Sequence, residues 1–464
     1  MSSSLKQVLL GGAIWAGAGK LISMVCNFVL TIVLTHGISP AAYGGYHVVT
    51  TTIIILATVG TLGMDQVVVR FASMCQAIGD RVALGVIVAT CVKAVVAGSL
   101  VTALLFFYVA PWFMGDVLQM PDLINYLWII VVWLVLATVQ RQLAETWRGL
   151  NDIRFATIFG GIRNVGMLTA VTTCIGMVAL WAMGMLTLRS ALWVMLSTSA
   201  LTVLAAALVM RARFPQMTTP ATNVGVEWSG QRALSEAWPL WLAVMITVLS
   251  SLGSTWLASA FDTPEHVALF GVAQKFTLLL VAPLVVINAI LPPVIAQLHA
   301  TGELVRLQHV VQAVAGITLL PCLFLLLFLV VAGRPLLDLL FGDYYVASFP
   351  MLLLICLGQV ANIATGSWQI VLPMTGSRYQ VLYASGISLF VQLVMGIWLG
   401  MVWGVWGVAV GYCTSIVIAN VVGMLIVKNS VGIWTYAVIN RATIELGRNM
   451  ITSRIKRSTS PRIA

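Results

Sequence analysis

The sequence predicts an all-α polytopic membrane protein of about 12 transmembrane helices in two pseudo-symmetric six-helix lobes. Composition supports this class, because 60% of the 464 residues are hydrophobic and only 8% are charged, with a mean hydropathy of +1.02. Soluble domains carry roughly 25% charged residues. A second observation is a repeat that divides the chain into two matching halves. A third is the placement of basic residues at alternate predicted turns.

Apolar segments follow one another along the whole chain, each near the ~20 residues that a helix needs to cross the hydrocarbon core. We predict twelve spans, at residues 9–35, 44–64, 82–108, 122–147, 156–183, 190–210, 237–260, 267–297, 308–332, 348–372, 380–400 and 404–427.

The two halves match at one constant offset along the chain. Pro40 precedes an aromatic residue, Tyr46, by six positions, and Pro264 precedes Phe270 in the same way. The dipeptide Arg154-Phe155 matches Arg378-Tyr379 at the same offset. Repeated halves are typical of transporters that move substrate by alternating access. The repeat predicts an N-terminal lobe at 1–212, a cytoplasmic connector at 213–235, a C-terminal lobe at 236–428 and a basic cytoplasmic tail at 429–464.

Basic residues mark the predicted cytoplasmic side. If both termini are cytoplasmic, most of the 24 Lys and Arg residues lie at the cytoplasmic ends of spans, and only Arg189 and Arg334 lie on the external side of the membrane. This is the positive-inside pattern. The net charge of +10 therefore reflects orientation and contact with the inner leaflet, and we expect no nucleic-acid partner.

The sequence contains no motif for metal binding or for ATP hydrolysis. The seven cysteines are dispersed and form no metal-ligand spacing, and no Walker A sequence is present. We therefore expect no cofactor, no metal and no enzymatic reaction.

Ionisable residues inside membrane spans are costly, and each is a candidate site residue. Here they are mostly cations: Lys20, Lys93, Arg163 and Lys275. Span four ends with Arg141, Glu145 and Arg148 on one helical face. Glu145 is the only acid expected at comparable depth, and we expect it to hold Arg141 and to titrate. The alternative is an ordinary interfacial ion pair with snorkelling side chains.

Three segments resemble the bacterial polysaccharide-export family, which contains O-antigen and teichoic-acid flippases: L-T-H-G-I-S-P-A-A-Y-G-G-Y (34–46), G-T-L-G-M-D-Q-V-V-V-R-F-A (60–72) and W-R-G-L-N-D-I-R-F (147–155). The family belongs to the multidrug/oligosaccharidyl-lipid/polysaccharide exporter superfamily. The resemblance implies two lobes forming a V, with spans one, two, seven and eight lining a cleft that Lys20 and Lys275 face. His36 stands where the family commonly carries a basic residue, usually Arg, so this chain has a titratable group there in place of a permanent cation.

The resemblance implies a flippase that moves a polyprenyl-diphosphate-linked oligosaccharide from the inner to the outer leaflet of the bacterial inner membrane, for surface polysaccharide such as lipopolysaccharide O-antigen. The predicted substrate-binding residues are Lys20, Lys275, Arg70, Arg141 and Arg163, and the predicted coupling or gating residues are Glu145 and His36. Expected partners are the lipid-linked oligosaccharide and membrane lipids, with a polymerase and glycosyltransferases of the same pathway. Two alternatives remain: a multidrug/cation antiporter, which would carry buried acids, and a membrane glycosyltransferase or polymerase, which would need catalytic carboxylates.

Overall fold

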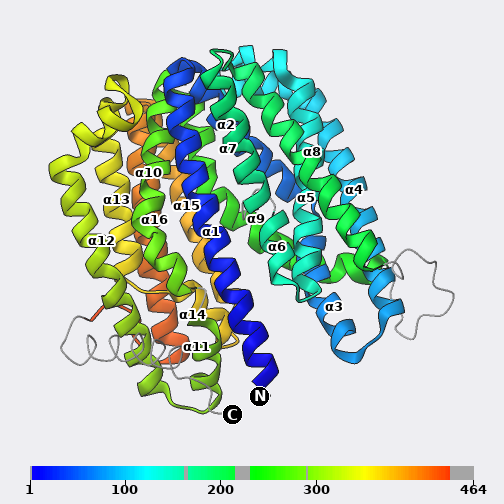
Figure 1. Cartoon of the computed structure of the whole chain (residues 1–464). Coiled ribbons are helices and arrows are strands. Elements are labelled where there is room, and N and C mark those ends of the chain that lie inside the picture. Colours follow the sequence, from blue (N-terminus) through cyan, green and yellow to red (C-terminus); the bar gives the residue numbers. More distant parts are fainter. Residues whose placement is uncertain (1–2, 161–165, 215–229, 289–290, 439–464) are drawn as a thin grey trace, which may run out of the picture. The chain divides into compact units, whose positions relative to one another are not determined.

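The computed structural model describes residues 3–160, 166–214, 230–288 and 291–438, and within them it contains helices and no strand (Figure 1). Eleven of the described helical segments are long and apolar enough to cross a membrane, and Met167–Ala182 is a shorter apolar helix. The predicted all-α polytopic membrane class is therefore confirmed.

The predicted spans correspond to the observed helices, and three of the spans each contain two helices. The helices are α1 Ser3–Gly37, α2 Pro40–Gly60, α3 Met64–Ile78, α4 Arg81–Trp112, α5 Leu127–Gly149, α6 Ile153–Phe159, α7 Met167–Ala182, α8 Leu188–Arg213, α9 Gly230–Phe261, α10 Pro264–Asn288, α11 Leu291–Ala300, α12 Leu304–Phe341, α13 Phe349–Ala364, α14 Trp368–Met374, α15 Arg378–Trp403 and α16 Val405–Val431, with short turns Phe113–Val117, Pro121–Tyr126 and Asp343–Ser348. The fifth predicted span contains α6 and α7, the eighth contains α10 and α11, and the tenth contains α13 and α14.

Packing divides the chain into two compact units, Met1–Gly271 and Val272–Ala464. In the first unit α5 is central, because it packs against α4, α8, α3 and α2; α4, α5 and α8 lie side by side in Figure 1. In the second unit α16 packs against both α15 and α13. The first unit includes α9 and the start of α10, so it extends beyond residue 212. The division into lobes at 1–212 and 236–428 remains a prediction.

In both copies of the sequence repeat, a helix begins at the matching proline. α2 begins at Pro40 and α10 at Pro264, and proline favours the first turn of a helix because its missing N–H has no helical partner there. A Cβ atom on Gly44 would collide with the carbonyl of Pro264 and would lie 3.4 Å from the backbone nitrogen of Ala268. One on Gly271 would lie 2.9 Å from the ring of His47. Positions 44 and 268 are separated by the repeat offset, and so are positions 47 and 271, so matching positions meet where these two helices begin.

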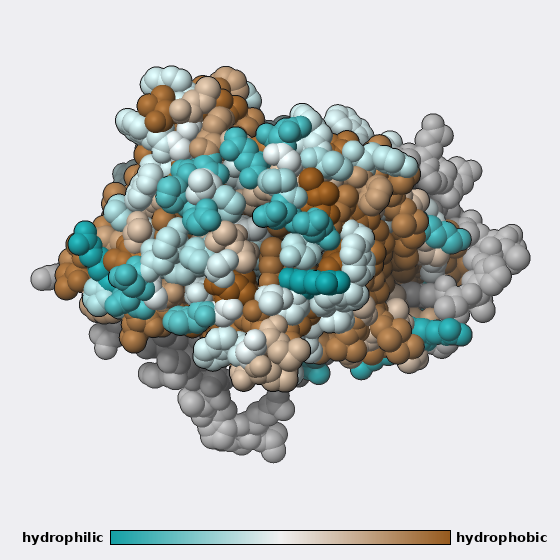
Figure 2. All heavy atoms as spheres, turned by 90° about the horizontal axis from the view of Figure 1, so that it is seen from above, coloured by the Kyte–Doolittle hydropathy of each residue, from teal (hydrophilic) through white to brown (hydrophobic). Residues whose placement is uncertain are grey.

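Exposed apolar side chains are those expected of a membrane protein. Large hydrophobic residues are exposed along α4, such as Leu104 and Tyr108, and along α12, such as Phe324 and Val331. Figure 2 looks onto the ends of the helices, where hydrophilic residues are frequent among exposed hydrophobic ones. This distribution suits helices whose flanks contact lipid and whose ends contact water.

Candidate functional site

The chain bends sharply between α2 and α3. Leu62 and Gly63 both have positive φ values, 49° and 76°, so the helix stops after Gly60 and restarts at Met64. A Cβ atom on Gly63 would lie 2.6 Å from the carbonyl oxygen of Ala237 on α9. Glycine is therefore required both by the backbone conformation and by the close approach of α9.

Asp65 lies in the first turn of α3 and is only 1% exposed. A carboxylate at this position is stabilised by the positive end of the helix dipole. The backbone N–H of Gln66 donates to its Oδ1 at 3.0 Å, and the Gln66 side-chain amide donates to its Oδ2 at 3.4 Å. The bend thus places a negative charge inside the first unit.

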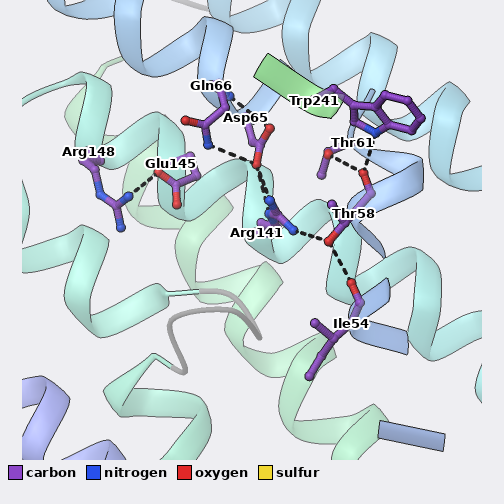
Figure 3. A network of polar contacts seen from close by, with 9 residues as sticks. All are labelled: Ile54, Thr58, Thr61, Asp65, Gln66, Arg141, Glu145, Arg148 and Trp241. Carbon is purple, nitrogen blue, oxygen red and sulfur yellow. Dashed lines mark hydrogen bonds and ion pairs between the residues drawn. The ribbon is translucent and has the colours of Figure 1, made fainter. Parts of the chain in front are cut away.

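Arg141 on α5 neutralises this charge. Its guanidinium donates to Asp65 Oδ2 from Nε at 3.0 Å and from Nη2 at 2.6 Å, and from Nη1 to the hydroxyl of Thr58 at 2.7 Å (Figure 3). Arg141 is 4% exposed. A buried ion pair is favourable only when its hydrogen bonds are well satisfied, and here all three guanidinium nitrogens donate a hydrogen bond.

Thr58 extends the network to α9. Its carbonyl oxygen accepts a hydrogen bond from Trp241 Nε1 at 2.9 Å, and its hydroxyl donates to the carbonyl of Ile54 at 2.8 Å. We call Thr58, Asp65, Arg141 and Trp241 the Arg141 node. It joins α2, α3, α5 and α9 within the first unit, as the sticks in Figure 3 show.

The node corrects two sequence-based expectations. Glu145 was expected to be the only acid at depth, but Asp65 is also buried. Glu145 was also expected to hold Arg141, whereas the carboxylate that hydrogen-bonds Arg141 is Asp65, and Glu145 forms an ion pair with Arg148 at 2.7 Å. The signal that could have revealed Asp65 is its position directly after the T-L-G bend. Its partner Arg141 is distant in sequence, so the pairing required the fold.

Lys20 lies on α1, inside the apolar segment Gly17–Gly37, and its side chain is exposed. α1 reaches this position by packing against α6 and α7, with Gly19 in close contact with the methyl group of Thr157. Lys20 is therefore an exposed cation on a membrane helix.

The other predicted site residues have surroundings of their own. Arg70 is exposed and stacks its guanidinium on Phe71 at 5.3 Å. His36 is exposed, contacts the Ile32 carbonyl through Nδ1 at 2.9 Å, and lies roughly 24 Å along α1 from Lys20. Lys275 lies on α10 in the second unit and is partly buried. Arg163 lies outside the described residues.

The second unit contains a comparable interruption, at residues 365–367 between α13 and α14. The residues that surround it are neutral. Trp368 Nε1 donates to Asn420 Oδ1 at 2.8 Å, and the hydroxyl of Ser367 donates to Asn288 Oδ1 at 2.7 Å. We call Asn288, Ser367, Trp368 and Asn420 the Trp368 node. Within the described residues, neither unit contains a cluster of three His, Cys, Asp or Glu side chains able to hold a metal.

Residues 9–299 match the polysaccharide biosynthesis protein family, and residues 239–399 match the MatE family. A comparison with curated protein sequences finds no significant match.

Several solved structures share the fold across nearly the whole chain. An inward-facing multidrug resistance MATE family transporter of the MOP superfamily has 14% identity and a TM-score of 0.69, covering 90% of this chain and 98% of that one. The lipid II flippase MurJ in an inward closed conformation has 12% identity and a TM-score of 0.65, covering 98% and 94%. A mutant of the Vibrio cholerae MATE transporter VcmN has 18% identity and a TM-score of 0.62, covering 93% and 98%.

Proposed function

The chain belongs to the polysaccharide biosynthesis protein family, and we propose on that premise that it is a flippase for a polyprenyl-diphosphate-linked oligosaccharide. It would move this substrate from the inner to the outer leaflet of the bacterial cytoplasmic membrane by alternating access. The shared fold with MurJ, a lipid II flippase, and with MATE transporters supports a transport role. Family membership confirms the resemblance that the sequence motifs indicated.

One observation carries the proposal: Lys20 is an exposed cation within the apolar segment Gly17–Gly37 of α1. A charge inside a membrane span is costly without a counter-charge. An anionic diphosphate would supply that counter-charge and accept charge-assisted hydrogen bonds from the lysine. Asp65 and Glu145 are each paired with another cation, Arg141 and Arg148.

In this proposal Arg141 does not contact the diphosphate, because its guanidinium is buried and is held by Asp65 and Thr58. It positions the α2–α3 bend instead. Lys275, Arg70 and Arg163 remain proposed contributors to anion binding, and Glu145 and His36 remain proposed coupling or gating residues. The sugars would cross in a hydrated cleft while the lipid tail stays in the bilayer. An ion gradient, the membrane potential or consumption of product would supply direction.

We further propose that both termini face the cytoplasm, as the positive-inside pattern predicts. Single cysteines introduced at 116 and 152 should then react with an impermeant thiol reagent from opposite sides of the membrane. Five of the seven native cysteines are buried, which limits background labelling. A polymerase and glycosyltransferases of the same pathway are the proposed functional partners.

The decisive experiment is restoration of surface glycan in cells that lack the endogenous flippase. Lys20→Ala should lower the restored glycan by about tenfold or more, since hydrogen bonds to charged groups contribute roughly 1.5–3 kcal/mol. Lys20→Arg should recover more activity than Lys20→Gln, because Arg keeps the charge. Lys93→Ala is the matched control, since Lys93 is also an exposed lysine on a membrane helix. Equal activity of Lys20→Ala and Lys93→Ala would refute the role of Lys20.

A second candidate is a cation antiporter, which the MatE match to residues 239–399 favours. Such a protein would use a carboxylate to bind a cationic solute. The buried acid found here, Asp65, is occupied by Arg141, which makes it a poor cation site. Efflux of a cationic dye by the purified protein in vesicles would favour the antiporter over the flippase.

A further inference from the structure

The chain does not leave the second unit when α16 ends. Gly432 adopts a left-handed conformation with φ 82° and terminates the helix. The residues that follow, 433–437, which we call the C-terminal strap, return into the unit. Ile433 is 2% exposed and belongs to a buried apolar cluster with Trp368 of α14 and Val427 of α16. The chain is therefore anchored by an apolar side chain directly after its last helix.

The strap supplies hydrogen-bond donors to the interruption between α13 and α14. The hydroxyl of Thr435, which is fully buried, donates to the carbonyl of Thr365 at 2.6 Å. The backbone N–H of Ala437 donates to the carbonyl of Ala364 at 2.7 Å. Carbonyls at a helix end lack partners within the helix, and a buried carbonyl left without a donor is costly.

Two further contacts fix the strap in register. The carbonyl of Thr435 lies where a Cβ atom would be on Gly366, so only glycine admits it there, and Gly366 also has φ 82°. The backbone N–H of Trp434 donates to the side-chain oxygen of Gln308 on α12 at 3.0 Å. The strap is thus bound by α12 and by the end of α13 through a combination of backbone and side-chain bonds.

We propose that the α13–α14 interruption and α12 form a docking site for an extended peptide, and that its resident ligand is this chain's own strap, which clamps the interruption. The peptide's features match the site: a buried apolar residue at 433, a backbone donor at 434, a hydroxyl donor at 435 and a second backbone donor at 437. With the strap in place the two helices are held at one bend. Without it the carbonyls of Ala364 and Thr365 lose these donors and the interruption opens more often.

This inference goes beyond the proposed flippase activity, and its test requires no substrate. Hydrogen–deuterium exchange is measured on the full-length protein in detergent, at the amides of residues 365–371, which lie in and beside the interruption. Thr435→Val keeps the shape of the side chain and removes its donor, and it should raise exchange there by about tenfold, the effect of leaving a buried carbonyl unsatisfied. Thr435→Ser, which keeps the hydroxyl, should exchange more like the wild-type chain.

Matched controls separate the clamp from a general effect of the substitution. Thr375→Val removes a hydroxyl that bonds only to carbonyls of its own helix, Val371 and Leu372, and should leave exchange at 365–368 unchanged. A chain ending after Val438 keeps the strap and should match the full-length protein, whereas one ending after Val431 should exchange faster. Wild-type exchange at 365–371 in Thr435→Val would overturn the proposal, and this variant decides the matter even if the shorter chain fails to fold.

Discussion

Each unit holds a break between two consecutive helices, but with different chemistry. Arg141 in the first unit and Thr365 in the second are separated by the repeat offset, so they occupy matching positions in the two halves. Around Arg141 the α2–α3 bend is held by a buried ion pair with Asp65. Around Thr365 the α13–α14 interruption is held by neutral hydroxyl, amide and indole groups.

This difference indicates that the buried charges of the first unit have a use other than stability. Neutral hydrogen bonds are enough to satisfy the backbone at an interruption, as the bonds from Thr435 and Ala437 to the carbonyls of Thr365 and Ala364 show. A buried ion pair often gives no more stability than a well-packed neutral alternative, yet losing one partner is strongly destabilising. The Arg141 node therefore makes the first unit dependent on charge, and this is the unit that also carries exposed Lys20.

The largest expected effect comes from Asp65→Asn, which leaves the buried Arg141 charge uncompensated. We expect it to lower the free energy of unfolding by about 3–5 kcal/mol, measured by denaturant titration in mixed micelles. Glu303→Gln is the control, because the side chains of Glu303 and its partner Arg306 are 43% and 70% exposed and exposed pairs contribute little to stability.

A double variant sharpens this result. Asp65→Leu combined with Arg141→Met removes both charges and should be much more stable than Asp65→Leu alone, since no unpaired charge remains. If Asp65→Asn lowers the stability no more than Glu303→Gln does, the ion pair does not hold the α2–α3 bend, and the two units do not differ in the way described.

An intermediate effect is expected from Trp368→Phe in the second unit. The change removes the indole donor and leaves the Oδ1 atom of Asn420, which is 4% exposed, without that bond. The loss should be about 1–3 kcal/mol by the same titration, smaller than for Asp65→Asn. Trp403→Phe, at a 58% exposed position, should have little effect. A Trp368→Phe loss larger than that of Asp65→Asn would reverse the ranking of charged and neutral nodes.

The smallest effect is expected from Trp241→Phe, which removes the hydrogen bond from α9 to the Thr58 carbonyl. That carbonyl keeps the hydroxyl of Thr61 as a donor at 2.9 Å, so we expect a loss of only about 0.5–1.5 kcal/mol. Trp238→Phe, nearby on α9 and 61% exposed, is the matched control. Indistinguishable stability of the two variants would mean that Trp241 does not fasten α9 to the Arg141 node.

The sequence by itself determined the features that depend on local or averaged properties. Membrane insertion depends on the hydrophobicity of about 20 consecutive residues, so the spans were predictable from composition and order. Pro40 and Pro264 restrict their own backbone, so the starts of α2 and α10 were predictable from single residues. The cationic bias of the spans was also evident, because it requires only a count of Lys, Arg, Asp and Glu.

Only the tertiary structure decided which groups meet. Arg141 pairs with Asp65, and not with Glu145, because the bend at Leu62 and Gly63 turns α3 toward α5. Residues 433–437 resemble the start of a tail in sequence, yet they pack into the second unit because the α13–α14 interruption leaves carbonyls that need donors. Both outcomes depend on partners that are distant in sequence. Every buried acceptor needs a donor, but a local sequence pattern does not determine which distant donor bonds to it.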